Sequence, residues 1–129
     1  MKRIVLLMTL LFVVGLGGCM KVKETNKIVY KTITQVEAKE IIDTTSDYII
    51  LDVRTLEEFN TGHIPNAINI PNEVILDQAE SILTNKEQVI LVYCRSGRRS
   101  KEAASKLVDL GYSNVLEFGG IIDWKYEIE

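Results

Sequence analysis

The stretch that decides the fold is VILVYCRSGRRS, residues 89–100. The unbroken apolar run 89–93 is typical of a strand that is buried on both faces of a parallel sheet. It leads directly to Cys94, and an arginine-rich loop then enters a segment with helical spacing from Ser100 to Leu110. Because open α/β sheets bind ligands at the carboxyl ends of their strands, this loop is where we first expect chemistry.

The rest of the chain alternates between the period of a strand and that of a helix. Further strands are expected at 28–33, 48–53, 67–70 and 115–118. Capping boxes at Thr34–Glu37 and Thr55–Glu58 predict two helix starts, Asn72 is expected to cap a helix over 73–83, and Gly111 to end the helix over 100–110. The apolar positions expected to face inward are Val36, Ile41, Ile42, Val74, Ile75, Ala79, Ile82 and Leu83. This order predicts one α/β domain with a mainly parallel sheet flanked by helices.

Composition excludes several classes of protein. With 129 residues, 47% hydrophobic and 26% charged, the chain has the size and balance of one globular domain. Two cysteines and one histidine are too few for a self-contained structural zinc site or a disulfide framework, and we expect no metal and no cofactor. The net charge of −3 argues against a nucleic-acid partner.

The N-terminus has the pattern of a secretory signal. Lys2 and Arg3 precede an apolar run, 4–16, that is short for a membrane span. The sequence LGGC, residues 16–19, resembles the lipobox of bacterial lipoproteins, which implies cleavage before Cys19 and a lipid on its thiol. We therefore expect a signal peptide over 1–18, a tether over 19–26 and a domain over 27–129, anchored outside the cytoplasm of a bacterium. The alternative is an uncleaved signal anchor in which Cys19 is incidental.

The loop after Cys94 is suited to holding an anion. Backbone N–H groups can turn inward at the start of a helix, and Gly97 allows the loop to bend. The loop holds three arginines, Arg95, Arg98 and Arg99, whose positive potential favours the thiolate of Cys94 and makes it a strong nucleophile. The alternative is that Cys94 is a small buried hydrophobic residue, which seldom occurs in a cationic loop.

Three ordered motifs resemble those of rhodanese domains, over about residues 31–125. They are Cys-x-x-Gly-x-Arg-Ser from Cys94, the stretch LDVRTLEEFNTGHIPNAINIP over 51–71, and Gly119-Gly120-x-x-x-Trp124. The resemblance implies a three-layer rhodanese-like fold and a thiosulfate-type sulfurtransferase. In that reaction Cys94 takes the outer sulfur of thiosulfate as a persulfide, sulfite leaves, and a thiophilic acceptor then removes the sulfur. Two-step covalent catalysis of this kind gives ping-pong kinetics.

The roles within the loop follow from charge and from the resemblance. The backbone amides of residues 95–100 are expected to hold the anionic persulfide, so the anion-binding loop comprises Arg95, Ser96, Gly97, Arg98, Arg99 and Ser100. We expect Arg95 and Arg98 to border the pocket and attract thiosulfate, although both could be solvated surface charges. The family's recurrent arginine corresponds to Arg99, which implies an inward or structural role.

Four polar residues of the 51–71 motif are expected to act structurally: Asp52, Arg54, Glu58 and His63. An ion pair of Arg54 with Glu58 is predicted, and Asp52 and Arg54 are expected near the pocket. A triad of Asp52, His63 and Cys94 is rejected, because a thiolate held by backbone amides needs no base. Trp124 is expected in the core or in a pocket wall.

Two other functions stay open. A phosphatase or arsenate reductase on the same scaffold needs an arginine after five intervening residues, where this chain has Ser100, and Arg99 comes one position early. A non-catalytic rhodanese-like binding module usually lacks the cysteine, and Cys94 is present. The expected partners are a small sulfur-containing anion such as thiosulfate, a thiol or protein acceptor that the sequence does not specify, and the membrane through the Cys19 lipid.

Overall fold

A computed structural model describes residues 27–129, and the predicted signal peptide, lipidated Cys19 and tether lie outside that range. The described chain forms a five-stranded sheet in the order β1-β5-β4-β2-β3, and all its strand pairs are parallel. The strands are β1 Lys31–Thr32, β2 Tyr48–Asp52, β3 Ile68–Asn69, β4 Val89–Cys94 and β5 Val115–Gly120. The predicted parallel sheet is therefore confirmed, with β4 as its central strand.

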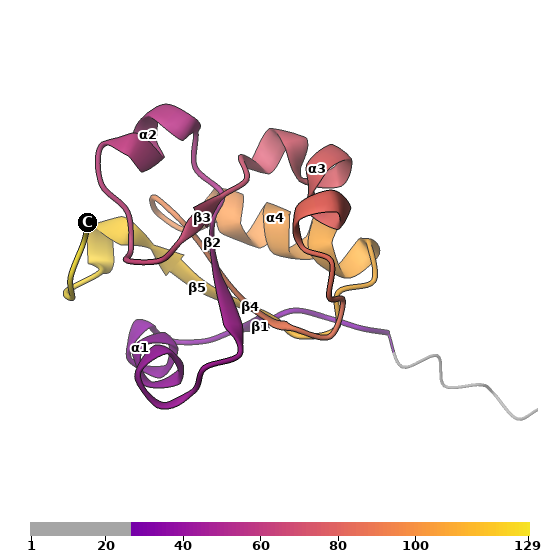
Figure 1. The fold of residues 1–129 in the computed structure, drawn as a ribbon, viewed down its shortest axis with the longest axis horizontal. Coiled ribbons are helices and arrows are strands. Elements are labelled where there is room, and N and C mark those ends of the chain that lie inside the picture. The colour runs from indigo at the N-terminus through magenta and orange to yellow at the C-terminus, as the bar shows by residue number, and fades with distance from the viewer. Residues whose placement is uncertain (1–26) are drawn as a thin grey trace, which may run out of the picture.

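Helices cover both faces of the sheet. They are α1 Gln35–Thr44, α2 Leu56–Asn60, α3 Ile75–Ile82 and α4 Arg98–Asp109, with the 3-10 turns η1 Asn72–Val74 and η2 Ile121–Asp123. Figure 1 shows α1 on one side of the sheet and α3 and α4 on the other, which confirms the predicted three-layer α/β fold. Within residues 27–129 no helix has both the length and the apolar composition needed to span a bilayer.

Each face of the sheet has its own hydrophobic core, because successive side chains of a strand point to opposite faces. Val92 and Cys94 of β4 belong to the core that α3 and α4 cover. Leu91 and Tyr93 belong to the core that α1 covers. The thiol of Cys94 therefore begins on the face of the sheet against which α4 packs.

Three local predictions were wrong. Val36 is 66% exposed, because it lies on the opposite face of α1 from the buried Ala38. Ile82 is 48% exposed, since α3 ends there and Leu83, just beyond the helix, takes the buried place. Asn72 starts a 3-10 turn and makes no capping hydrogen bond. Its side chain instead binds two residues of α4, donating to Glu102 Oε2 and accepting from Lys106 Nζ.

A β-bulge in β5 shapes the region beside Cys94. Val92 pairs with Glu117 but Cys94 pairs with Gly120, so β5 contains one residue more than β4 over this interval. Gly119 within the bulge has φ +88°, a conformation that glycine adopts without strain. The extra residue brings Gly120 against the backbone of Arg95, where an added Cβ would lie 1.9 Å from the carbonyl oxygen. The end of β5 therefore supports the start of the Cys94 loop.

Candidate functional site: the Cys94 loop

The loop after β4 wraps around the sulfur of Cys94. Sγ accepts a hydrogen bond from the backbone N–H of Gly97 at 3.0 Å and lies 3.5 Å from Ser100 Oγ. Gly97, with φ +111°, is the N-terminal cap of α4, so the positive end of this 12-residue helix faces the sulfur. Cys94 itself is 1% exposed. The loop thus encloses a sulfur atom next to a helix N-terminus, as an anion-holding site requires.

Ser100 connects the cysteine to a buried acid that the sequence analysis did not identify. Its hydroxyl lies 2.7 Å from Glu117 Oε1 and 2.9 Å from the carbonyl oxygen of Gly97. Both Ser100 and Glu117 are fully buried. The available signal was an acidic residue within the otherwise apolar strand 115–118, which is unusual because a buried charge is costly.

The three arginines of the loop differ in their partners. Arg98 extends into solvent, with its side chain 75% exposed, and pairs with Glu102 one helical turn later. Arg99 forms a two-point ion pair with Glu58, with N–O distances of 2.7 and 3.0 Å. Arg95 is exposed and takes part in no salt bridge within the described chain. Arg95 is therefore the loop cation whose charge no carboxylate neutralises at short range.

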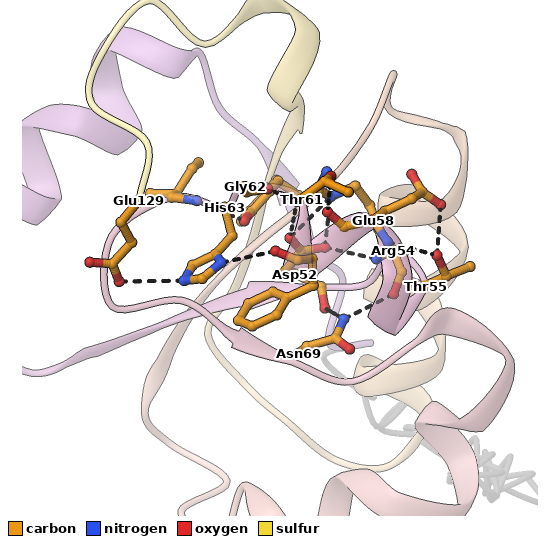
Figure 2. Close-up of polar contacts among 12 residues, drawn as sticks. Asp52, Arg54, Thr55, Glu58, Thr61, Gly62, His63, Asn69 and Glu129 are labelled. Carbon is orange, nitrogen blue, oxygen red and sulfur yellow. Dashed lines mark hydrogen bonds and ion pairs between the residues drawn. The ribbon is translucent and has the colours of Figure 1, made fainter.

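The predicted ion pair between Arg54 and Glu58 is wrong. Arg54 instead contacts both carboxylate oxygens of Asp52 and donates to the carbonyl of Gly62. Both members of this pair are buried, and Asn69 donates to the backbone carbonyls of Asp52 and Arg54, as Figure 2 shows. Asp52 and Arg54 are two residues apart at the end of β2 and form a local ion pair. Arg54 therefore does not compete for Glu58, which pairs with Arg99.

The pair with Arg99 changes the ionisation of Glu58. The hydrogen bonds from the guanidinium lower the pKa of the Glu58 carboxyl to about 2. The same pair raises the pKa of Arg99, so both groups are charged at neutral pH. The ion pair between Glu58 and Arg99 therefore connects α2 to the first turn of α4.

His63 is held away from the sulfur. Its Nδ1 donates to the carbonyl of Phe59 at 3.0 Å, its ring stacks on that of Phe59, and Nε2 lies 3.4 Å from a carboxylate oxygen of Glu129. Figure 2 shows His63 and Glu129 pointing toward each other. No hydrogen bond in the described part of the chain joins Asp52 or His63 to Cys94. The structure thus does not assemble a Cys–His–Asp triad.

Trp124 lies apart from the Cys94 loop. It is 8% exposed and packs in the core under α1. It also lines a cavity of about 470 Å³ together with Ile64 and Tyr126, and no residue of the Cys94 loop lines that cavity. Trp124 is thus both a core residue and a pocket wall, as predicted, but the pocket is not that of the cysteine.

Comparison with known proteins identifies the family. The profile of the rhodanese-like domain matches residues 34–127, and the chain belongs to this family. It is 40% identical over 81 residues to a sulfurtransferase of Allochromatium vinosum, covering 62% of this chain and 74% of that protein. It is 33% identical over 99 residues to thiosulfate sulfurtransferase GlpE of Coxiella burnetii, covering 76% and 90% respectively.

Solved structures and longer relatives agree with this assignment. The structure described as rhodanese with anions from E. coli has a TM-score of 0.60 and 30% identity, over 64% of this chain and 96% of that chain. The adenylyltransferase and sulfurtransferase UBA4 of Candida albicans is 33% identical over 96 residues. That match covers 69% of this chain but only 22% of the UBA4 protein, so the chain corresponds to one part of the longer enzyme.

Proposed function

We propose that this protein is a sulfurtransferase that moves sulfane sulfur from thiosulfate or a persulfide donor to a thiophilic acceptor through a persulfide on Cys94. The observation that carries the proposal is the Gly97 N–H donating to Cys94 Sγ at the N-terminus of α4. Two relatives named as sulfurtransferases support the same reaction class.

The proposed reaction has two displacements. The Cys94 thiolate attacks the outer sulfur of thiosulfate, a bond forms between the two sulfurs, and sulfite leaves with the electron pair of the broken S–S bond. A thiolate or cyanide then attacks the outer sulfur of the persulfide and releases the Cys94 thiolate. In both steps the N–H of Gly97 and the N-terminus of α4 stabilise negative charge at the sulfur atoms.

We also propose that the mature chain lies outside the cytoplasm and is anchored to a bacterial cell membrane by a lipid on Cys19. This proposal is supported by Lys2, Arg3, the short apolar run 4–16 and the sequence LGGC at 16–19. Cleavage there would leave 13 basic and 18 acidic side chains, so an acidic domain would be held by its lipid rather than by electrostatic attraction to anionic lipids.

Intact-mass spectrometry of the full chain after incubation with thiosulfate tests the sulfurtransferase proposal. We expect a gain of about 32 Da, the mass of one sulfur atom carried on a thiol. Cys94→Ser should abolish the gain, while Cys19→Ser, which removes the other cysteine, should retain it. Hydrolysis of p-nitrophenyl phosphate without thiosulfate loading would instead favour the phosphatase alternative. A gain that persists in Cys94→Ser would overturn the proposal.

A further inference from the structure

Glu117 is a buried acid without a cation. It is 0% exposed, and no salt bridge within residues 27–129 includes it. Its Oε1 accepts from Ser100 Oγ at 2.7 Å and from the Gly119 N–H at 2.8 Å, and its Oε2 accepts from Thr32 Oγ1 at 3.2 Å. Both carboxyl oxygens accept from neutral donors, and none of these donors is a cation.

The hydroxyl of Ser100 lies between this carboxylate and the reactive sulfur. Its distance to Glu117 Oε1, 2.7 Å, is the shortest of its contacts, so its one hydrogen points to Glu117 and its lone pairs face Cys94 Sγ at 3.5 Å. The two contacts place the carboxylate within about 6 Å of Sγ. A negative charge on Sγ therefore faces a lone pair of Ser100 Oγ, and the buried carboxylate of Glu117 lies directly beyond that oxygen.

Two other charged residues lie near Glu117 without neutralising it. Lys101 of α4 and Asp123 of η2 line the same cavity of about 260 Å³ as Glu117, together with Ser96 and Gly97. Neither Lys101 nor Asp123 forms a salt bridge with a described residue. The charge of Glu117 thus acts on the Cys94 loop without a short-range counter-ion.

We propose that Glu117 is a positioning residue that favours the sulfur-loaded form of Cys94 over the free thiolate. The inference depends on the proposed function. In the thiolate, the charge is on Sγ. In the persulfide, Sγ is a neutral sulfide and the charge lies on the outer sulfur, one S–S bond or about 2 Å farther along. Because Ser100 Oγ lies between Sγ and Glu117, we expect the outer sulfur to lie farther from the carboxylate than Sγ does, so that repulsion decreases when sulfur is loaded.

The loading equilibrium measures this effect directly. Thiolate and thiosulfate give persulfide anion and sulfite, with one S–S bond formed, one broken and no proton exchanged. Total charge is unchanged, so the equilibrium responds to where the charge on the protein lies. Coulomb's law with an effective dielectric constant of about 20 predicts about a threefold change when the charge moves about 2 Å farther from a carboxylate about 6 Å away.

The test uses the full chain at about pH 9.5, above the ordinary cysteine pKa of about 8.5. Intact mass gives the loaded fraction at fixed ratios of thiosulfate to sulfite. Glu117→Gln should raise the ratio needed for half-loading about threefold, because the free thiolate is no longer repelled. Glu117→Met, an uncharged side chain of similar size, should give the same shift and provides a second variant if the amide does not fold. Thr32→Val, which removes a hydrogen bond to Glu117 but keeps its charge, should leave the ratio unchanged.

The outcomes separate the two proposals. If wild type gains the sulfur and both uncharged variants load at the wild-type ratio, the role of Glu117 is overturned and the sulfurtransferase proposal stands. A shift in Thr32→Val as large as in Glu117→Gln would also overturn it, since a purely structural effect would then suffice. If wild type gains no sulfur at any ratio, the proposed function fails, and this inference fails with it.

Discussion

Gly120 and Arg95 lie closer together than any side chain at position 120 would allow. A Cβ on Gly120 would fall 1.9 Å from the Arg95 carbonyl oxygen and 2.5 Å from the N–H nitrogen of Ser96. The β-bulge of β5 creates this contact by inserting one extra residue opposite the end of β4. Two motifs that are distant in the sequence thus form one backbone contact beneath the cysteine loop.

Gly120→Ala should therefore displace the loop. The clash is with backbone atoms that cannot rotate away, so we expect a loss of more than about 2 kcal/mol in the free energy of unfolding, together with loss of thiosulfate loading. Denaturant unfolding and intact mass measure the two effects. Gly111→Ala is the matched control: Gly111 has φ +97° but no atom within 4 Å of the added Cβ. It should cost about 1–2 kcal/mol from backbone strain and keep the loading. Equal effects of the two substitutions would contradict this explanation.

The ion pair of Glu58 with Arg99 should make stability depend on pH. The pKa of Glu58 in the folded protein is about 2, below its ordinary value of 4.5, so the pair stabilises the fold above about pH 4.5 and this contribution is lost as the pH falls toward 2. Glu58→Gln should cost about 1 kcal/mol at pH 7, since the pair is bidentate but partly exposed. The difference from wild type, measured by urea unfolding at several pH values, should vanish near pH 2. A difference that is constant with pH would contradict the charge pair as its cause.

Arg95 should contribute more than Arg98 to attracting thiosulfate. Both are exposed, but Glu102 pairs with Arg98 whereas no described acid pairs with Arg95. Arg95→Ala should raise KM for thiosulfate about threefold to tenfold with little change in kcat, because a peripheral charge recruits an anion without acting on the leaving sulfite. Arg98→Ala should raise KM less. Steady-state kinetics at low and high salt give the comparison, and the reverse order would show that Arg98 faces the substrate.

His63 should matter for stability and little for chemistry. Its contacts are with Phe59 and Glu129, and none reaches Cys94. His63→Ala should lower the free energy of unfolding by about 1–2 kcal/mol through lost stacking and hydrogen bonding, and keep most of kcat per folded molecule. Circular dichroism establishes the folded fraction before the assay. A collapse of kcat in a folded His63→Ala protein would mean that the histidine serves as a base.

Cys19 should carry the lipid. Expression of Cys19→Ala in a bacterial host should yield an unprocessed precursor that incorporates no labelled fatty acid, because sulfur is the atom that accepts the lipid. Cys94→Ser is the matched control and should be processed and labelled like wild type. Labelling of Cys19→Ala at the wild-type level would rule out the lipobox interpretation.

Short-range patterns of the sequence proved the most predictable features of the fold. The Thr34–Glu37 capping box is fully formed, and the apolar run before Cys94 is the central strand of the sheet. At the second box, Thr55 accepts from the Glu58 N–H as predicted, but the carboxylate of Glu58 accepts from the Thr55 hydroxyl and from Arg99, not from the Thr55 N–H. Residues within one helical turn of each other determine a cap, whereas the competing partner is 41 positions away.

Long-range polar contacts were the features that the sequence did not reveal. Glu117 reaches Ser100 because β5 pairs with β4, with Glu117 opposite Val92, and no local pattern encodes that pairing. Arg54 has three acids within four positions, Asp52, Glu57 and Glu58. Charge alone cannot choose among them, and the tertiary position of Arg99 engages Glu58 while Asp52 pairs with Arg54.

The sheet also has a property that concerns neighbouring molecules. Its two edge strands, β1 and β3, are each only two residues long. An unpaired strand edge is where the sheets of separate molecules join and aggregate, and short edges or an edge lysine such as Lys31 discourage this. Lipid anchoring would confine many copies to one surface and make collisions between them frequent. The short edges leave such crowded neighbours little backbone on which to build a shared sheet.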